Sequence, residues 1–349
     1  MANWGTTYGA APPLEAPVGK PLEPRHTGQL RHSHEVKTVR YRPDGTILAS
    51  AGYDKRLQFW RLPDLKNVLT ICVDDYIETI DWSSDGGLIA CGGMLDNTAR
   101  VYDYASGEDL FGEDLKHEGV VYAVAFSRTA DMLVCGCFAK KITVWDAKKG
   151  HLVTTLAAMG VVKALAWGPD GTMLASGGFD AAVSVWRTDP AASEKPSEES
   201  LAWRSGLGNA AADCLALAFS PDGKLLASAD WARHVTLWDA VTGGKVHVFE
   251  LPDRLHAVAF SPRSDLVACG GWKCRVALFD VASKAQVDTL YIGAEHEDDA
   301  GGQWVRDVEF SPDGGTVAVC SDDHAVHLWP RSPLWGNAQA HSASEQSGA

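Results

Sequence analysis

The chain has 349 residues, 46% of them hydrophobic, which is enough to bury a large core, and its formal net charge is −14 with a sequence pI near 5.2. It has no run of about 18 apolar residues, which excludes a membrane-spanning helix, and its first 25 residues lack the basic start and apolar run of a secretory signal. Because an acidic chain repels a nucleic-acid backbone, we expect neither nucleic acid nor a membrane as a direct partner.

Residues 1–27 are rich in Pro, Ala and Gly, and we expect them to form a flexible leader. From residue 28 onward the chain repeats one unit of short strands, and each copy ends in an aromatic residue. These residues are Trp60, Tyr102, Trp145, Trp186, Trp238, Phe279 and Trp329, at intervals of 42, 43, 41, 52, 41 and 50. A period in the low forties with this strand chemistry predicts the blades of a propeller.

The repeat has a physical basis, which is clearest in residues 163–186 and 215–238. In both copies a strand ending in Ala-aromatic is followed by Pro-Asp-Gly, in which proline presets a turn dihedral and glycine accepts a positive φ. The second strand is built from small apolar residues, as in Leu-Leu-Ala-Ser at 225–228, which suits a place where sheets crowd together. The third strand alternates apolar and polar residues, which is the period of a strand with two unlike faces. A more variable fourth strand follows.

This repeat resembles the WD-repeat (WD40) family over roughly residues 30–330, and the Trp-Asp pair is retained at 145–146 and 238–239. The resemblance implies an all-β fold, a seven-bladed propeller of four-stranded antiparallel blades spanning residues 28–331. In this family one terminus usually supplies the outer strand of the last blade. The Pro-Arg-Ser-Pro that follows Trp329 is a poor strand, so we expect residues 28–33 to close the ring.

Two insertions explain the two longest intervals. Residues 188–200, rich in Pro, Ser and Glu, are expected to form a mobile loop between the third and fourth strands of the fourth blade. Residues 293–303 are expected to form an acidic loop on the upper face, open to a basic partner or simply solvated. Residues 332–349 are expected to be a disordered tail.

The resemblance also implies a hydrogen-bond network in each blade, from a His before the first strand, a Ser or Thr, an Asp and the closing Trp. Only the first blade carries all four, as His32, Ser50, Asp54 and Trp60. The His, Ser and Asp are those of a catalytic triad, but their place in the repeat assigns them a structural role. We therefore expect no catalytic residue. Cys135 and Cys137 lack a second ligand pair, so we expect no metal and no cofactor.

The residue before the turn Asp, or before its substitute, marks a candidate binding surface. In the seven blades it is Tyr53, Leu95, Phe138, Phe179, Trp231, Trp272 and Asp322. Hairpin tips normally favour Gly, Asn and Asp, so large aromatic side chains there indicate contacts with a partner on the upper face. Residues at or just before the first strands are expected to face the same opening: Tyr76, Glu78, Tyr122, Lys163, Arg254, His256, Trp304 and Arg306. Trp, Tyr and Arg are enriched in binding hot spots.

The sequence therefore predicts a non-catalytic interaction scaffold that binds a protein or peptide, possibly a basic one, as a monomer or as a subunit of a complex. One alternative is a reader of methyl-lysine peptides in a chromatin complex, with the tip aromatics and Asp322 or Glu78 forming a cage. A remote alternative is a propeller hydrolase. The eight cysteines, several of them in small-residue strands, indicate a reducing compartment. We expect a cytoplasmic protein, with the nucleus as the other possibility.

Overall fold

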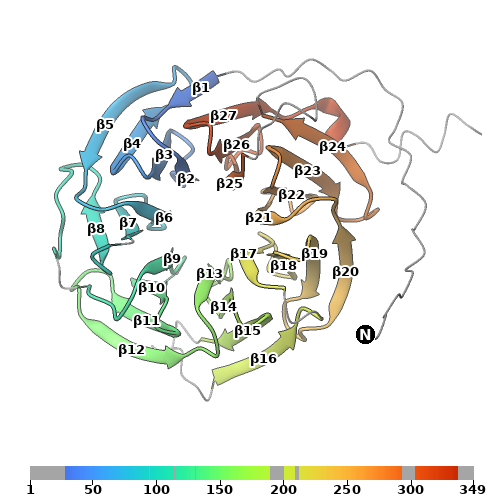
Figure 1. The fold of residues 1–349 in the computed structure, drawn as a ribbon, viewed down its shortest axis with the longest axis horizontal. Coiled ribbons are helices and arrows are strands. Elements are labelled where there is room, and N and C mark those ends of the chain that lie inside the picture. The colour runs from blue at the N-terminus through green and yellow to red at the C-terminus, as the bar shows by residue number, and fades with distance from the viewer. Residues whose placement is uncertain are drawn as a thin grey trace, which may run out of the picture.

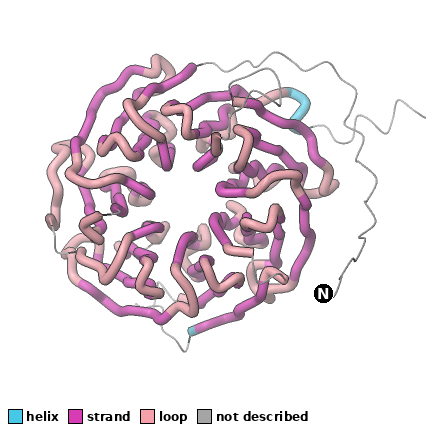
Figure 2. Tube along the Cα trace, viewed as in Figure 1, coloured by secondary structure: helices cyan, strands magenta, loops and turns pink. Residues whose placement is uncertain are grey.

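The computed structural model describes residues 28–336, except residues 94, 113–114, 130, 189–199, 209–211 and 293–302. In this part of the chain the strands form seven small antiparallel sheets that stand as blades around a common centre (Figure 1). Strands make up almost all of its regular structure (Figure 2). The predicted all-β, seven-bladed propeller is confirmed.

The blades follow chain order around the ring, and in each blade the strands succeed one another from the axis outward. Blade 1 holds β2 (Val36–Tyr41), β3 (Ile47–Gly52), β4 (Arg56–Arg61) and β5 (Lys66–Cys72). Blade 2 holds β6 (Ile77–Trp82), β7 (Leu88–Gly93) and β8 (Ala99–Asp103). Blade 3 holds β9 (Val121–Phe126), β10 (Met132–Cys137), β11 (Lys141–Asp146) and β12 (Leu152–Ala157). Blade 4 holds β13 (Val162–Trp167), β14 (Met173–Gly178), β15 (Ala182–Arg187) and β16 (Leu201–Gly206).

The remaining three blades complete the ring. Blade 5 holds β17 (Cys214–Phe219), β18 (Leu225–Asp230), β19 (His234–Asp239) and β20 (Lys245–Glu250). Blade 6 holds β21 (Leu255–Phe260), β22 (Leu266–Gly271), β23 (Arg275–Asp280) and β24 (Gln286–Tyr291). Blade 7 holds β25 (Val305–Phe310), β26 (Thr316–Ser321), β27 (Ala325–Pro330) and, outermost, β1 (Gly28–Arg31).

The core lies between neighbouring blades. Phe59 of blade 1, for example, packs with Trp82 and Tyr102 of blade 2 in one buried cluster. The seven closing aromatics are all buried, and the small second strands between them carry buried alanines such as Ala49 and Ala227. Small side chains allow adjacent sheets to approach closely while the large rings fill the space between them. The repeat therefore encodes the contacts between blades as well as the strands.

The ring is closed by the N-terminal strand, as predicted. Strand β1 pairs antiparallel with β27, and its register runs from Gly28 opposite Leu328 to Arg31 opposite Ala325. Leu30 is buried in a cluster with residues of both blade 7 and blade 1. Just beyond the strand, the backbone N–H of His32 donates to the carbonyl of His324 at 2.8 Å. The two ends of the propeller are therefore joined within one sheet.

Blade 2 departs from the expected four strands, because its described part contains three. The outer position is taken by an irregular segment whose pairing beside β8 is limited to isolated bridges, Thr98 with Lys116 and Tyr102 with Asp109, and to scattered backbone hydrogen bonds such as that from the Leu110 N–H to the Val101 carbonyl. Asp109 turns the chain there, since its carboxylate accepts hydrogen bonds from the backbone N–H groups of Phe111 and Gly112. A tight turn in this place interrupts the ladder that a regular outer strand would need.

The ordered chain continues beyond Ser332, where the sequence analysis placed the start of a disordered tail. Pro333–Gly336 forms a short 3-10 helix, η2, and the Trp335 side chain is buried with residues of blades 6 and 7. The indole N–H of Trp335 donates to the Asp288 carboxylate at 2.6 Å. Burial of one large ring with a satisfied N–H is enough to hold this turn against the propeller. Residues 1–27 and 337–349, and nearly all of the insertions at 188–200 and 293–303, lie outside the described residues.

Candidate functional site

One face of the ring, the upper face, carries the hairpin tips between second and third strands and the connections that enter the inner strands. The two features touch in a regular way. In six blades the backbone N–H of the tip residue donates to the carbonyl of a residue just before the inner strand. The pairs are Tyr53 with Glu35, Phe138 with Val120, Phe179 with Val161, Trp231 with Asp213, Trp272 with Arg254 and Asp322 with Trp304. The predicted binding residues therefore lie on one face.

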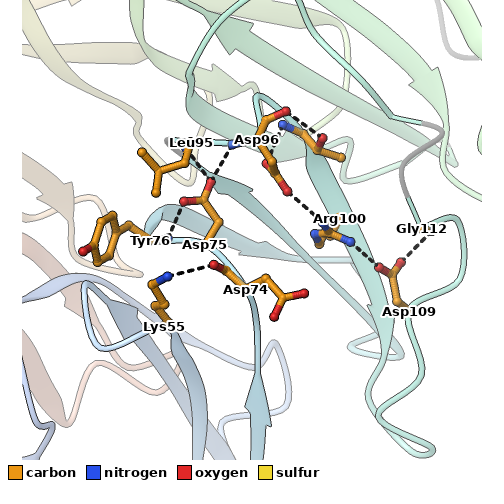
Figure 3. Close-up of polar contacts among 10 residues, drawn as sticks. Lys55, Asp74, Asp75, Tyr76, Leu95, Asp96, Arg100, Asp109 and Gly112 are labelled. Carbon is orange, nitrogen blue, oxygen red and sulfur yellow. Dashed lines mark hydrogen bonds and ion pairs between the residues drawn. The ribbon is translucent and has the colours of Figure 1, made fainter.

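Blade 2 achieves the same contact with a side chain (Figure 3). The Asp75 carboxylate accepts the backbone N–H groups of Leu95 at 2.6 Å, Asp96 at 3.2 Å and Tyr76 at 2.7 Å. Further out, Arg100 bridges the carboxylates of Asp96 and Asp109 at 2.7 and 3.2 Å. This ionic chain fastens the irregular outer segment of blade 2 to its hairpin tip.

A second regular feature surrounds the ring axis. The pairing of every inner strand with its neighbour skips the second residue of the inner strand. Such bulges re-aim the side chain of the unpaired residue. The seven residues are Lys37, Glu78, Tyr122, Lys163, Leu215, His256 and Arg306. Burial, together with repulsion by Arg306, Lys163 and Lys37, lowers the pKa of His256 to about 3. Positive groups on blades 1, 4 and 7 thus act on His256 of blade 6, as expected for side chains that share the axis.

Blades 5 to 7 bring the three predicted tryptophans of this region together. The Trp231 and Trp304 rings stack with centroids 5.2 Å apart, and Trp272 meets Trp304 edge to face at 4.8 Å. The Arg254 guanidinium lies 4.6 Å from the centre of the Trp231 ring. All three rings are partly exposed. We call Trp231, Trp272, Trp304 and Arg254 the tryptophan cluster.

Arg306 and Asp322 lie beside this cluster. They form a two-pronged ion pair, with distances of 2.6 Å from Nε and 2.8 Å from Nη2 to the two carboxylate oxygens. The Arg306 guanidinium carbon is also 5.6 Å from the centre of the Trp304 ring. A paired arginine next to stacked rings gives a rigid surface whose side chains lose little freedom when a partner binds.

Blades 1 and 2 hold a separate group. The Tyr53 hydroxyl donates to the Glu78 carboxylate at 2.6 Å, and its ring lies 5.2 Å from that of Tyr76. The Lys37 ammonium is 4.2 Å from the centre of the Tyr53 ring. Burial raises the pKa of Tyr53, and the neighbouring Glu78 carboxylate raises it further. Tyr53, Tyr76 and Glu78 are therefore linked to each other.

Blades 3 and 4 present a different surface. Phe138 and Phe179 are 56% and 48% exposed, and no ring contact is recorded for either. Leu95 and Met159 are more exposed still, at 66% and 72%. Met159 belongs to the four-residue connection that enters blade 4, and the sequence analysis did not identify it. The signal that would have found it is a large apolar residue next to glycine in so short a connection, where it has little chance of being buried. We call Leu95, Phe138, Met159 and Phe179 the rim patch. Closer to the axis, the Lys163 ammonium lies 3.4 Å from the centre of the Tyr122 ring.

The network of the first blade is assembled from the four named residues. The Trp60 indole N–H donates to Ser50 Oγ at 2.8 Å, His32 Nε2 is 2.7 Å from the same oxygen, and His32 Nδ1 is 3.0 Å from the Asp54 carboxylate. The distances are those of a catalytic triad. However, the His32 and Asp54 side chains and the whole of Ser50 have no exposed surface. Since no substrate can reach that hydroxyl, the geometry supports a structural role.

Other blades build partial networks in which the sequence identifies His117 and Asp323 but not their partners Thr143 and His327. In blade 3, Thr143 takes the place of the serine, with His117 Nε2 at 2.8 Å and the Trp145 indole nitrogen at 2.9 Å from its hydroxyl. In blade 7, His327 of the third strand lies 2.7 Å from the Asp323 carboxylate. A His inside the third strand, two residues before the closing Trp, is the signal that would have found the latter.

The described residues contain no group of three or more His, Cys, Asp or Glu side chains arranged to hold a metal ion. The part of the chain that the structure covers also contains no helix long and apolar enough to cross a membrane. All eight cysteines are free thiols, and all but Cys72 are buried.

Comparison with known proteins agrees with this architecture. Residues 74–330 match the family described as the IFT122 first beta-propeller, and residues 23–61 match the WD domain, G-beta repeat. The first match spans well over half of the chain, so the protein belongs to this family of WD-repeat β-propellers.

Individual relatives match over a shorter stretch. The small ribosomal subunit protein RACK1 of Caenorhabditis elegans is 32% identical over 118 residues, which cover 33% of this chain and 35% of the relative. The RACK1 protein of Drosophila melanogaster is 31% identical over 119 residues, covering 33% and 36%. MST50-interacting protein 11 of Pyricularia oryzae is 31% identical over 128 residues, covering 36% and 39%. The matched region therefore spans little more than a third of each relative.

Proposed function

We propose that this propeller is a non-catalytic interaction scaffold that binds a protein or peptide partner on its upper face. The observation that carries the proposal is the tryptophan cluster. Three partly exposed indoles and an arginine are held in contact, and two of the indoles, Trp231 and Trp272, stand at hairpin tips, where such large side chains are otherwise unfavourable. Preorganised Trp and Arg side chains are the typical centre of a binding hot spot.

The relatives support an assembly role. Two of them are named as ribosomal-subunit proteins, and a third is named for its interaction with MST50. For this chain we propose membership of a larger complex in the cytoplasm, which the eight free thiols also favour over an oxidising compartment. A methyl-lysine cage gains no support from these tryptophans, because Arg254 lies over the Trp231 ring and Trp304 is in contact with both Trp231 and Trp272.

The test compares the wild-type protein with a Tyr53→Ala, Trp231→Ala, Trp272→Ala variant. Partners captured from lysate by the wild type are purified, and their Kd values for both proteins are measured by titration calorimetry. Loss of one hot-spot ring costs about 2 kcal/mol or more, so we expect the variant to bind at least roughly 30-fold more weakly.

The control is Leu152→Ala, which removes an exposed apolar side chain from the outer strand β12, away from the upper face. Thermal melting first establishes that both variants fold. The proposal is wrong if the triple variant binds every purified partner as tightly as the wild type does.

A further inference from the structure

The rim patch is a group of highly exposed apolar side chains on the upper face. Its four residues belong to three consecutive blades, Leu95 to the tip of blade 2, Phe138 to the tip of blade 3, and Met159 and Phe179 to the connection and tip of blade 4. The other highly exposed large hydrophobic residues in the described chain lie on outer strands, on the outer segment of blade 2 or in the turn after β19. Among the described residues of the upper face, the highly exposed large hydrophobic side chains are therefore confined to one sector. A contiguous apolar sector rimmed by polar groups is typical of an interaction site.

Two glycines leave the phenylalanines of this sector uncovered. A Cβ on Gly160 would lie 2.7 Å from the backbone nitrogen of Asp180, and one on Gly119 would lie 3.1 Å from the Cβ of Phe138. The corresponding position in blade 1 is His34, whose ring lies 6.0 Å from that of the tip residue Tyr53. In blade 1 the His34 side chain therefore covers the tip residue Tyr53. The corresponding glycines of blades 3 and 4 have no side chain to cover Phe138 and Phe179.

The inner border of the sector holds an ammonium group without an ion-pair partner. Arg306 is paired with Asp322, and Lys37 lies 3.6 Å from the Glu35 carboxylate. No carboxylate of the described residues lies within ion-pair distance of the Lys163 ammonium group, which stands over the Tyr122 ring instead. Burial lowers the pKa of Lys163 to about 8, and Lys37 and Arg306 contribute to this, whereas Glu78 opposes it. A desolvated charge of this kind gains more than an exposed one from an added anion.

Lys163 lies near the rim patch, because backbone hydrogen bonds join the tip residues of the patch to the connections that enter the inner strands. The backbone N–H of Phe179 is bonded to the carbonyl of Val161, two residues before Lys163. In the same way, Phe138 is bonded to Val120, two residues before Tyr122. The exposed rings and the Tyr122–Lys163 pair are thus the outer and inner parts of one surface on blades 3 and 4.

We propose that blades 2 to 4 bind a peptide segment that places apolar side chains on the rim patch and one carboxylate on Lys163. A carboxylate fits better than a phosphate, because Lys163 offers one positive charge and the nearby Glu78 repels a dianion. The net charge of −14 repels acidic segments in proportion to their charge, so it favours a segment with a single carboxylate over a polyacidic one. This inference rests on the proposed scaffold function and names the chemistry of its partner.

The experiment selects ligands from a phage-displayed library of random dodecapeptides on the intact wild-type protein. The enriched sequences are synthesised, and their affinities are measured by fluorescence anisotropy. We expect them to share an Asp or Glu flanked by aromatic or aliphatic residues, and to lose at least tenfold in affinity when that acid becomes Asn or Gln. The protein variants Lys163→Met and Phe138→Ser with Phe179→Ser are expected to show losses of the same size.

Two control variants separate the possible results. Leu152→Ser changes an exposed side chain on the outer wall, and Trp272→Ala changes the tryptophan cluster; neither should weaken these peptides. Peptides without an acidic residue, or with equal affinity for Lys163→Met, would overturn the inference. If binding depends on Trp272 and not on Phe138 and Phe179, the inference is wrong while the scaffold function stands. If no upper-face variant affects any selected peptide, both are wrong.

Discussion

Leu30→Asp is expected to destabilise the whole propeller by about 3–5 kcal/mol, because it places a charge in a buried apolar cluster and removes a leucine that fills it. The Leu30 side chain is 3% exposed and packs with residues of blades 7 and 1. Apart from rings such as Trp304 and Trp231 on the upper face, the blades pack against their neighbours, so closure between the last and the first blade is what converts an open row into a ring. Without a firmly docked β1, the outer edge of β27 loses its pairing partner.

The measurement is urea unfolding followed by tryptophan fluorescence. Gln29→Ala is the matched control, because Gln29 is the exposed neighbour of Leu30 on the same strand. It should change the free energy of unfolding by no more than about 0.5 kcal/mol. Closure by β1 would not be the source of stability if Leu30→Asp unfolded at the same urea concentration as the wild type.

The fold was predictable because each repeat contains the turn residues and the strand pattern that determine its local structure. Pro-Asp-Gly at 221–223 forms the expected turn, with Gly223 at a φ of +72°, and the small second strand that follows is fully paired. Blade 2 shows the limit of this reading. Its outer segment has no alternating pattern, and the turn made by Asp109 depends on a side-chain contact that no period predicts.

The candidate site was predictable in its residues but not in its grouping. Position in the repeat identified the hairpin tips, but it gave Trp231, Phe138 and Phe179 the same predicted role and did not show that their surroundings differ. Trp304 precedes β25 of blade 7 and stacks on a ring of blade 5, which is a tertiary contact without a sequence period. The exposure of Phe138 and Phe179 depends on what the neighbouring connections lack, namely side chains at Gly119 and Gly160.

The seam between blades 7 and 1 has a second set of contacts, centred on Arg40 of β2. Arg40 is ion-paired with Asp307 of β25, and the carboxylates of Glu309 and Asp81 attract it as well. Asp307 also accepts hydrogen bonds from the Thr38 hydroxyl and from the backbone N–H of Val39. One guanidinium thus attracts three carboxylates contributed by blades 7 and 2, of which Asp81 is also paired with Arg128 at 3.6 Å.

Arg40→Met is expected to destabilise the protein by about 3–5 kcal/mol at pH 8, because the Asp307 and Glu309 carboxylates would remain buried without the counter-charge of Arg40. Burial raises the pKa of Glu309 to about 8, and Asp307 and Asp81 also raise it, whereas Arg40 and the backbone N–H of Tyr41 lower it. A folded-state pKa above the unfolded value of 4.5 means that protonated Glu309 favours the fold. That contribution is complete below pH 4.5 and is lost as the pH rises towards 8.

The pH dependence separates this electrostatic account from a simple loss of packing. At pH 5 Glu309 of the folded protein is protonated, so one fewer negative charge depends on Arg40, and the deficit of Arg40→Met should be smaller than at pH 8. Glu309→Gln keeps an acceptor for the Tyr41 N–H, which lies 2.6 Å from the glutamate oxygen, and removes the ionisable group. It should therefore stabilise the protein at pH 8 and recover part of the loss in the double variant. Equal deficits of Arg40→Met at pH 5 and pH 8 in urea unfolding, with no recovery by Glu309→Gln, would show that Arg40 acts through packing alone.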